Sequence, residues 1–229
     1  MDDSKNMEHK CKIAVLSASL GNFDKSIKHT DQSIEYDYFV FTDENFPPRF
    51  KSITSRLQAK VPKFFGWQLT PGYDYYIWLD GNIIMTDTDT IKYFYDSCQG
   101  YDMVVFRHPS RPNIRQEVRY TRKGINQESL YMLGRYQNEW LKEQNEAIES
   151  DKDYVDDLLL SGGAFMYRSN SDVQNMFKEW WYNVSRYIIQ DQIAFPYVLK
   201  KSGIKFNIRS DNIFENKYLK TKRHRNRAR

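Results

Sequence analysis

The chain has 229 residues, a length that suits one large domain or at most two small ones with a sizeable buried core. Hydrophobic residues make up 40% of it and aromatic residues 16%, a composition that excludes a disordered chain. Its two cysteines, Cys11 and Cys98, provide neither a disulfide framework nor a zinc-ligand spacing. The composition therefore predicts a folded globular protein with reduced thiols.

The formal net charge is +4, but residues 217–229 carry seven Lys or Arg and no carboxylate, so the rest of the chain is slightly acidic. We predict a single domain at residues 1–216 and a basic C-terminal tail at 217–229. The tail fits either an arm that binds polyanions or a solvated terminus. Residues 1–12 are too polar for a signal peptide, and no stretch reaches the roughly 20 apolar residues of a membrane span. These features predict a cytoplasmic protein without a membrane span.

The first half of the chain alternates between apolar runs and helical patterns. Strands are predicted at residues 12–20, 75–79 and 103–106, and helices at 55–69 and 90–97. In the segment 36–45 a further strand is predicted to stop at the polar residues 42–44. Polar loops follow the first two strands, where Gly21, Pro47 and Pro48 stop the extended pattern. This alternation predicts an α/β fold with a mostly parallel central sheet flanked by helices. Functional residues are expected in loops at the carboxyl ends of the strands.

Residues 107–123 contain five Arg, one Lys and a single Glu together with two prolines, and we predict a loop there. That loop fits either an anion site or a solvated charged surface. From Ser171 onward apolar residues recur at helical spacing, and Ser171 with Gln174 has the spacing of a capping box. A further helix is predicted from Asp191 to a point before Gly203, followed by a strand at residues 205–208.

The most informative segment is residues 73–87, where an apolar strand runs directly into Asp80, Gly81 and Asn82. A carboxylate and a carboxamide two residues apart can both face one cation, and Gly81 permits the tight bend between them. Asp-Gly is also an ordinary turn sequence. The segment alone therefore indicates either a divalent metal site or a simple turn.

Three segments in chain order carry a resemblance to a known family. They are RLQAKVPKFFGWQLTPGYDYYIWLDGN at residues 56–82, LLLSGGAFMYR at 158–168 and IIQDQIAFPYVL at 188–199. In that order they resemble nucleotide-sugar glycosyltransferases of the GT-A fold. The closest likeness is to the group catalogued as domain of unknown function 616, which includes plant pectin galacturonosyltransferases, and glycogenin-like enzymes are more distantly similar. The resemblance extends over roughly residues 12–216.

The resemblance implies that a Mn²⁺ or Mg²⁺ ion bridges the donor diphosphate at a strand-end Asp-x-Asp motif. Asp80 matches the first position of that motif, and Asn82 stands at the second, where an amide oxygen is a weaker ligand than a carboxylate. A third ligand in such enzymes comes from near the C-terminus, where His224 is the available histidine. The basic neighbours of His224 would then close over the diphosphate.

The resemblance also assigns residues that bind the donor. Arg56 and Lys60 would approach the donor phosphates, and Gly162 and Gly163 would let the backbone approach the donor sugar. A strand bulge is the alternative explanation for the two glycines. The nucleoside would contact the ends of the first two strands, at Ser17, Ala18, Leu20, Thr42 and Asp43.

Asp191 and Gln192 match an Asp-Gln pair that lies beside the anomeric carbon in glycogenin-like retaining enzymes. Asp191 would stabilise the oxocarbenium-like charge or act as a nucleophile, and Gln192 would position the sugar. Asp191 also suits the N-cap of a helix, which is the alternative interpretation. His108 and Arg111 resemble an HP-x-R element of the same family and are expected on the acceptor side.

Together with the resemblance, these features predict a metal-dependent glycosyltransferase that moves a sugar from a nucleoside diphosphate sugar to an acceptor hydroxyl. The resemblance implies that the anomeric configuration is retained. The acceptor would be a glycan or modified DNA. Two alternatives stay open: a nucleic-acid-binding protein with a degenerate transferase site, and a glycosyltransferase that acts on DNA bases. The sequence contains no signature of a serine hydrolase, a P-loop nucleotidase, a zincin or a Rossmann dinucleotide-binding fold.

Overall fold

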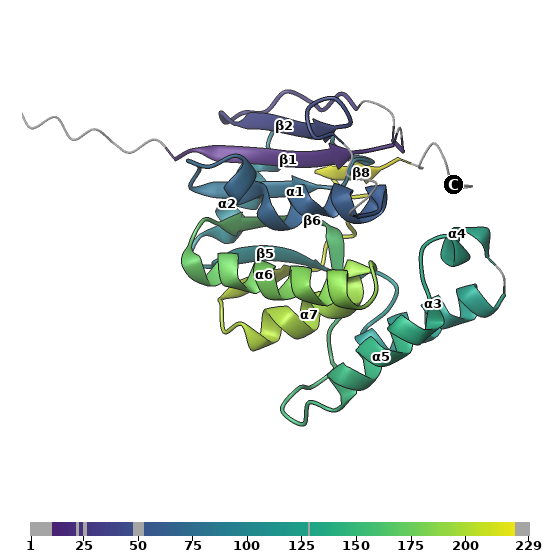
Figure 1. The fold of residues 1–229 in the computed structure, drawn as a ribbon. Coiled ribbons are helices and arrows are strands. Elements are labelled where there is room, and N and C mark those ends of the chain that lie inside the picture. The colour runs from purple at the N-terminus through teal and green to yellow at the C-terminus, as the bar shows by residue number, and fades with distance from the viewer. Residues whose placement is uncertain (1–10, 22, 25–26, 48–52, 128, 223–229) are drawn as a thin grey trace, which may run out of the picture.

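A six-stranded sheet forms the centre of the molecule (Figure 1). The computed structural model describes residues 11–21, 23–24, 27–47, 53–127 and 129–222. The strand order is β2-β1-β3-β6-β5-β7, and β6 alone runs antiparallel to its neighbours in this sheet of the described chain. The strands are β1 (Ile13–Ser19), β2 (Asp37–Thr42), β3 (Tyr75–Leu79), β5 (Met103–Arg107), β6 (Leu160–Arg168) and β7 (Phe206–Arg209).

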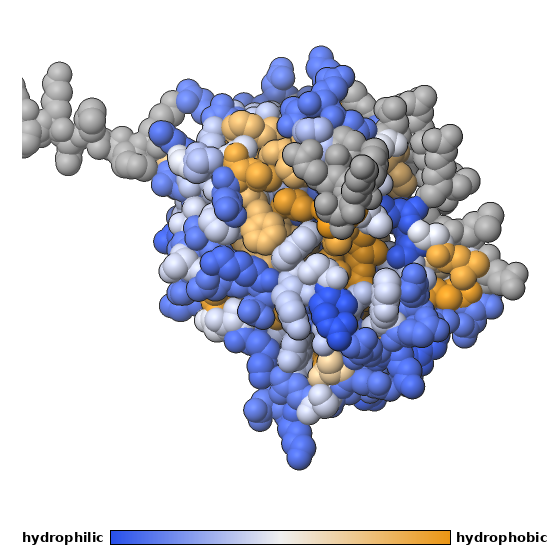
Figure 2. All heavy atoms as spheres, viewed as in Figure 1, coloured by the Kyte–Doolittle hydropathy of each residue, from blue (hydrophilic) through white to orange (hydrophobic). Residues whose placement is uncertain are grey.

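Helices cover both faces of this sheet, which is why its central strands are continuously apolar. On one face pack α1 (Ser55–Leu69), α6 (Ser171–Arg186) and α7 (Asp191–Lys201), and on the other packs α2 (Thr90–Cys98). Trp180 of α6 stacks on Phe195 of α7 with ring centroids 3.8 Å apart, and both are fully buried. The surface over this side is mostly hydrophilic, with hydrophobic side chains showing near its middle (Figure 2). The expected α/β architecture is confirmed.

Several predicted elements have nearly the predicted bounds. The helix at residues 55–69 is α1, which begins after Thr54, whose side chain accepts a hydrogen bond from the Leu57 backbone N–H at 3.2 Å. The cap of α6 differs from the prediction by one residue. Asn170, rather than Ser171, is the N-cap, because its side chain accepts from the Val173 backbone N–H at 2.9 Å.

The predicted loop at residues 107–123 is wrong over its second half, which belongs to the helix α3 (Ile114–Asn126). Both prolines lie before the N-cap, Asn113, so they delimit the helix instead of breaking it. Asn113 accepts a hydrogen bond from the Gln116 backbone N–H at 3.0 Å. Arg115, Arg119 and Arg122 occupy the exposed side of this amphipathic helix, whose other side is buried.

A helical arm, residues 114–149, projects from the sheet layer (Figure 1). It consists of α3, α4 (Leu130–Leu133) and α5 (Asn138–Glu149). A small hydrophobic cluster attaches it to the body, since Val118 of α3 and Leu141 of α5 are buried together with Ile193 of α7. The start of α7 therefore lies where the arm meets the sheet layer.

A second sheet of two short strands pairs β4 (Ile83–Met85) with β8 (Leu219–Thr221), antiparallel. β8 lies in the segment that the sequence assigns to the basic tail. The Lys222 backbone N–H continues the pairing by donating to the Asn82 carbonyl at 2.8 Å. The chain after β8 thus starts next to the Asp80–Asn82 turn. None of the helices in the described ranges has the length and hydropathy to cross a bilayer.

Candidate active site at the carboxyl edge of the sheet

Asp80 directly follows β3, at the edge where the parallel strands end. Its backbone N–H donates to the Gly163 carbonyl at 2.7 Å, and its carbonyl accepts from the Ile83 N–H at 2.8 Å, which closes the turn. The side chain is 44% exposed, and its Oδ1 accepts from Trp78 Nε1 at 2.7 Å. This carboxylate is therefore fixed in direction yet open to a ligand.

The rest of the turn is held by neighbouring elements. A Cβ on Gly81 would lie 2.8 Å from the Ala18 carbonyl oxygen, so only glycine permits the turn to approach β1 this closely. Asn82 is buried, and its Nδ2 donates to the Lys222 carbonyl at 2.9 Å. The turn is thus attached to the end of β1 and to the end of β8.

Asp191 is the first residue of α7, and its carboxylate contacts two lysines of α1. Its Oδ2 lies 2.8 Å from Lys60 Nζ and 2.5 Å from Lys63 Nζ. The N-cap is Gln190, so the alternative that Asp191 is the cap of the helix is wrong. The Asp191 carbonyl accepts from Trp180 Nε1 at 2.9 Å. Three helices, α1, α6 and α7, therefore converge on this residue.

Burial and charge compete in setting the ionisation of this cluster. Burial opposes ionisation of Asp191, but the charges of Lys60 and Lys63 outweigh it and lower the pKa of the carboxyl far below its usual range. For Lys60 burial dominates and lowers the pKa of the ammonium. For Lys63 burial is outweighed by Asp191 and Asp80, so its pKa is raised. Asp191 and Lys63 are consequently charged throughout the neutral range.

Lys63 links the two carboxylates. Its Nζ lies 3.6 Å from Asp80 Oδ1 in addition to its contact with Asp191, and its side chain is 2% exposed. The ammonium also sits 5.7–5.9 Å from the ring centroids of Trp78, Phe165 and Trp180, within cation–π range. Lys63 falls within the helix predicted at residues 55–69, but it is not among the predicted site residues. Its three-residue spacing from Lys60 puts both lysines on one helix face, and this spacing is the feature of the sequence that points to Lys63.

The two predicted glycines of β6 face these carboxylates from opposite sides of the strand. A Cβ on Gly162 would lie 3.2 Å from Lys63 Nζ and 3.3 Å from Asp191 Oδ1. A Cβ on Gly163 would lie 3.3 Å from Asp80 Oδ2. Successive residues of a strand point in opposite directions, so the missing side chains let the β6 backbone approach both carboxylates closely.

The residues predicted to contact a nucleoside also gather at this edge. Ser19 pairs in register with Thr42, and the Gly21 backbone N–H donates to Asp43 Oδ2 at 2.8 Å. The loops after β1 and β2 are therefore joined. All of the predicted nucleoside-side residues lie on these two strand ends: Ser17, Ala18, Leu20, Thr42 and Asp43.

Arg56 and Gln192 occupy less central positions. The Arg56 guanidinium donates to the Gly134 carbonyl in the helical arm, so it joins α1 to the segment between α4 and α5. Gln192 follows Asp191 in the first turn of α7 and is partly exposed. The contacts of Lys60, by contrast, place it in the cluster with Asp191.

His108 and Arg111 follow β5 and contact each other. The His108 Nδ1 accepts from the backbone N–H groups of Ser110 and Arg111 at 3.2 and 3.1 Å, and Arg111 Nη2 lies 2.9 Å from His108 Nε2. Burial, and then the charge of Arg111, lowers the pKa of His108 to about 4. The imidazole is therefore neutral at neutral pH. Arg111 also pairs with buried Glu117 and lies over the Tyr120 ring, 4.2 Å from its centroid.

The predicted metal ligands provide hard oxygen donors but few of them. In the described ranges no three His, Cys, Asp or Glu side chains form a group that could hold a metal ion. His224 lies outside the described residues. Asp80 and Asn82 nonetheless fit Mg²⁺ or Mn²⁺, because such ions are commonly held by one or two carboxylates together with substrate phosphates. The open side of Asp80 is where those phosphates would have to enter.

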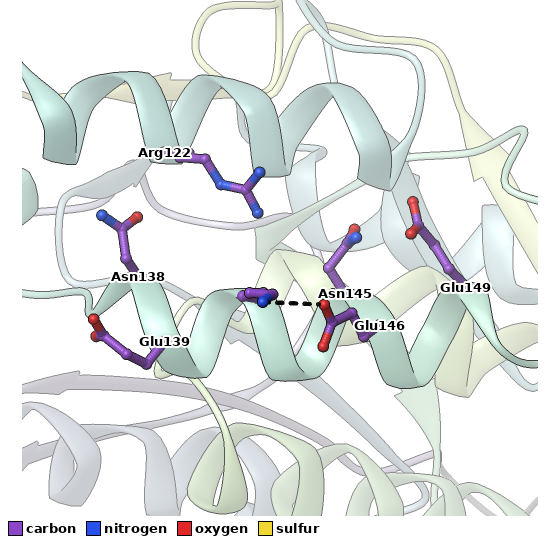
Figure 3. A pocket seen from close by; sticks show the side chains of 7 residues that line it. Arg122, Asn138, Glu139, Asn145, Glu146 and Glu149 are labelled. Atoms are coloured by element: carbon purple, nitrogen blue, oxygen red, sulfur yellow. Dashed lines mark ion pairs between the residues drawn. The ribbon is translucent and has the colours of Figure 1, made fainter.

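A separate shallow groove lies between α3 and α5 of the helical arm (Figure 3). Arg122 reaches toward it from α3, while Glu139 and Glu146 come from α5, and Lys142 pairs with Glu146 at 3.6 Å. The groove contains none of the residues described above. The charged side chains that line it belong to the solvent-facing sides of α3 and α5, as is usual for surface helices.

A mostly parallel sheet with a charged cluster at its carboxyl edge places the chain in the α/β class, in which ligands commonly bind at the strand ends. The chain belongs to the TOD1/MUCI70 glycosyltransferase-like domain family, whose profile matches residues 48–224, a range that includes Asp80 and Asp191. The resemblance to glycosyltransferases is confirmed at that level. No curated protein sequence matches the chain.

One similar solved structure is described as a glycosyltransferase involved in the glycosylation of the major capsid of PBCV-1. It shares 9% sequence identity with this chain at a TM-score of 0.45. The match covers 87% of this chain and 81% of the other.

Proposed function

We propose that the protein is a metal-dependent glycosyltransferase that transfers a sugar from a nucleoside diphosphate donor to an acceptor hydroxyl with retention of configuration. The observation that carries this proposal is the convergence of Asp80 and Asp191 on one buried lysine, Lys63. Family membership supports the reaction class. Both carboxylates lie at the strand edge where α/β folds bind ligands.

The donor diphosphate would bind between the Asp80 turn and the α1 lysines. Lys60 is the more accessible of the two, at 22% exposure, so it is the cation that a phosphate oxygen would reach first. A divalent cation held by Asp80 and Asn82 would neutralise charge on the departing diphosphate. The joined loops after β1 and β2 would hold the nucleoside, with Asp43 already fixed by Gly21.

Asp191 would act as a carboxylate and not as an acid, because its lysine partners keep it ionised. The bond from the anomeric carbon to the diphosphate breaks with its electron pair on the leaving group. The acceptor hydroxyl oxygen forms the new bond, and its proton passes to the departing diphosphate. A fixed negative charge beside that carbon stabilises the positive charge that develops there. Gly162 lets the β6 backbone lie directly beside Asp191, because a Cβ there would be only 3.3 Å from Asp191 Oδ1.

The remaining assignments extend this proposal. The neutral His108 and the adjacent Arg111 would border the acceptor. His224 would supply a third metal ligand, an assignment supported by the end of β8 lying beside Asn82. His224→Ala tests it: a loss of Mn²⁺ affinity together with donor hydrolysis would support the ligand role, and unchanged affinity would remove it.

The decisive experiment is a panel of nucleotide sugars incubated with the purified protein and Mn²⁺, with release of nucleoside diphosphate as the readout. Turnover with at least one donor, abolished by excess chelator, supports the proposal. The anomeric configuration of the product, read by NMR, tests retention. Salt-sensitive DNA binding without donor turnover would instead favour a nucleic-acid-binding protein with a degenerate site.

A further inference from the structure

A buried polar network connects the helical arm to the residue that precedes Asp191. Glu117 of α3 lies at its centre, with a side chain that is 2% exposed. Its Oε1 accepts from Gln190 Nε2 at 2.5 Å, and its Oε2 pairs with Arg111. The Gln190 Oε1 in turn accepts from Thr121 Oγ1 at 2.9 Å. Two consecutive turns of α3 therefore hold both ends of the Gln190 amide.

Gln190 is the N-cap of α7, so its position sets where that helix begins. On the other side Asp191 is fixed by Trp180, which donates to its carbonyl. The carboxylate is fixed by lysines of α1. The network on α3 holds the side chain of the residue just before Asp191, and it comes from the helical arm outside the sheet layer (Figure 1).

Burying the Glu117 carboxylate costs free energy, because the charged group loses its hydration when the protein folds. Burial raises the pKa of Glu117 despite the opposing charge of Arg111, which shows that the surroundings disfavour its ionised form. Apolar residues of similar volume are often equally or more stabilising at such positions. A hydrogen-bonded network adds direction, because its donors and acceptors match in one arrangement.

We infer that Glu117 is a positioning residue: through Gln190 it sets the start of α7 and thereby the placement of the Asp191 carboxylate against Lys60 and Lys63. The same side chain holds Arg111, so the predicted acceptor side and the Asp191 cluster share one anchor. This inference rests on the proposed function only for its effect on catalysis.

Three variants test the inference. Glu117→Ala removes both hydrogen-bond acceptors. Glu117→Gln can still bond to Gln190: the Gln190 side-chain amide turns over, its oxygen accepts from the new amide NH₂, and its own NH₂ donates to the Thr121 hydroxyl. Val118→Ala is the matched control, because Val118 is buried on the same helix in the cluster that attaches the arm but is not part of the network. Thermal melts define a temperature at which all three are folded.

With an active donor, Glu117→Ala should lower kcat about 10- to 100-fold with donor KM changed less than about threefold, as expected for a misplaced catalytic group. Glu117→Gln should recover most of that loss, and Val118→Ala should retain the wild-type kcat. Equal losses in Glu117→Ala and Val118→Ala would show that the network only stabilises the fold and would overturn the inference.

Crystal structures of the same variants give a readout that does not need turnover. In Glu117→Ala the Asp191 carboxylate should lose its contact with Lys60 or Lys63, and in Val118→Ala it should keep both. An unmoved carboxylate in Glu117→Ala would overturn the inference. If the wild-type protein turned over no donor, the proposed function would fall, and these structures would still decide the role of Glu117.

Discussion

Two aspartates at one edge of the sheet share a lysine yet differ in almost every other respect. Asp80 sits on a turn, is 44% exposed and accepts one hydrogen bond from Trp78. Asp191 begins a helix, has an 11% exposed side chain and contacts two lysines. The difference shows how surroundings change what one chemical group offers: the Asp80 carboxylate is open to a ligand, whereas the Asp191 carboxylate is an enclosed charge with a fixed position.

The largest effect is expected for Asp80→Ala. Without its carboxylate the turn loses its charged ligand for a cation, so metal-dependent donor turnover should fall by about a thousandfold or more. Donor-dependent release of nucleoside diphosphate measures it. Full activity in this variant would exclude the metal-bridged mechanism.

Asp80→Asn serves as the control for folding. Alanine leaves the Trp78 indole without its acceptor, at a cost of about 1–3 kcal/mol, whereas asparagine retains an oxygen at that position. Thermal stability should therefore fall in Asp80→Ala and stay near the wild-type value in Asp80→Asn. Both should lose turnover, because both lack the negative charge.

Asp191→Asn is expected to lower turnover by about a hundredfold with little change in donor KM, because it removes the charge at nearly constant shape. Steady-state kinetics against donor concentration separate the two parameters. A lowered donor affinity with unchanged kcat would show that Asp191 organises the lysines for binding and does not act on the transition state.

The same variant should also change the dependence of stability on pH. Because the pKa of Asp191 is lowered in the folded protein, its ionisation stabilises the fold above the unfolded value of about 4. That contribution is lost as the pH falls through the folded-state pKa. The difference in melting temperature between the wild type and Asp191→Asn should therefore narrow below about pH 4, as measured by thermal melts.

The two glycines of β6 allow each aspartate to be disturbed separately. A methyl group at Gly162 would meet Lys63 and Asp191, and one at Gly163 would meet Asp80. We expect Gly162→Ala to lower kcat about tenfold and Gly163→Ala chiefly to raise the Mn²⁺ concentration needed for half-maximal turnover, since a 1 Å misplacement is already costly. Metal titrations of both variants test this. Identical effects would mean that the two carboxylates act as one site.

The smallest effect is expected for Asn82→Asp. A second carboxylate should strengthen Mn²⁺ binding a few-fold, because charged oxygen ligands suit divalent ions better than amides. The gain is limited because Asn82 Nδ2 donates to the Lys222 carbonyl, and an aspartate there would face that oxygen without a proton. Calorimetric titration with Mn²⁺ and a thermal melt together should show tighter binding and a lower melting temperature.

The strands β1, β3 and β5 and the helix α1 were predictable from sequence because each has a local pattern of apolar residues that indicates its burial. β3 is an unbroken apolar run bounded by a Pro-Gly turn and Asp80, and α1 follows the capping residue Thr54. In contrast, β4 and β8 are three residues each and pair across more than a hundred residues of chain. Strands this short contain too few residues to show an alternation of apolar and polar side chains, so their pairing is set by tertiary structure.

The candidate site could be predicted only in part, because tertiary structure brings its residues together from distant parts of the chain. Asp80 and Asp191 stand in recognisable local motifs, and the fold brings Lys60 to the second of them. The spacing of Lys63 from Lys60 puts both on one helix face, but it does not indicate that Lys63 also reaches Asp80. The role of Glu117 could not be predicted from the sequence. The two prolines before α3 led to the prediction of a loop, and its partner Gln190 is 73 residues away in the chain.

The indoles beside the two aspartates make this site observable by fluorescence. Trp78 donates to the Asp80 side chain at 2.7 Å, and Trp180 donates to the Asp191 carbonyl at 2.9 Å. Indole emission shifts with the charge and polarity around the ring, so a cation arriving at Asp80 changes the spectrum of the chromophore attached to it. The chain has five tryptophans, and replacing Trp78 or Trp180 with phenylalanine would assign the signal to one carboxylate or the other. Ligand occupancy at each half of the site can thus be followed optically, without a label and before any substrate is identified.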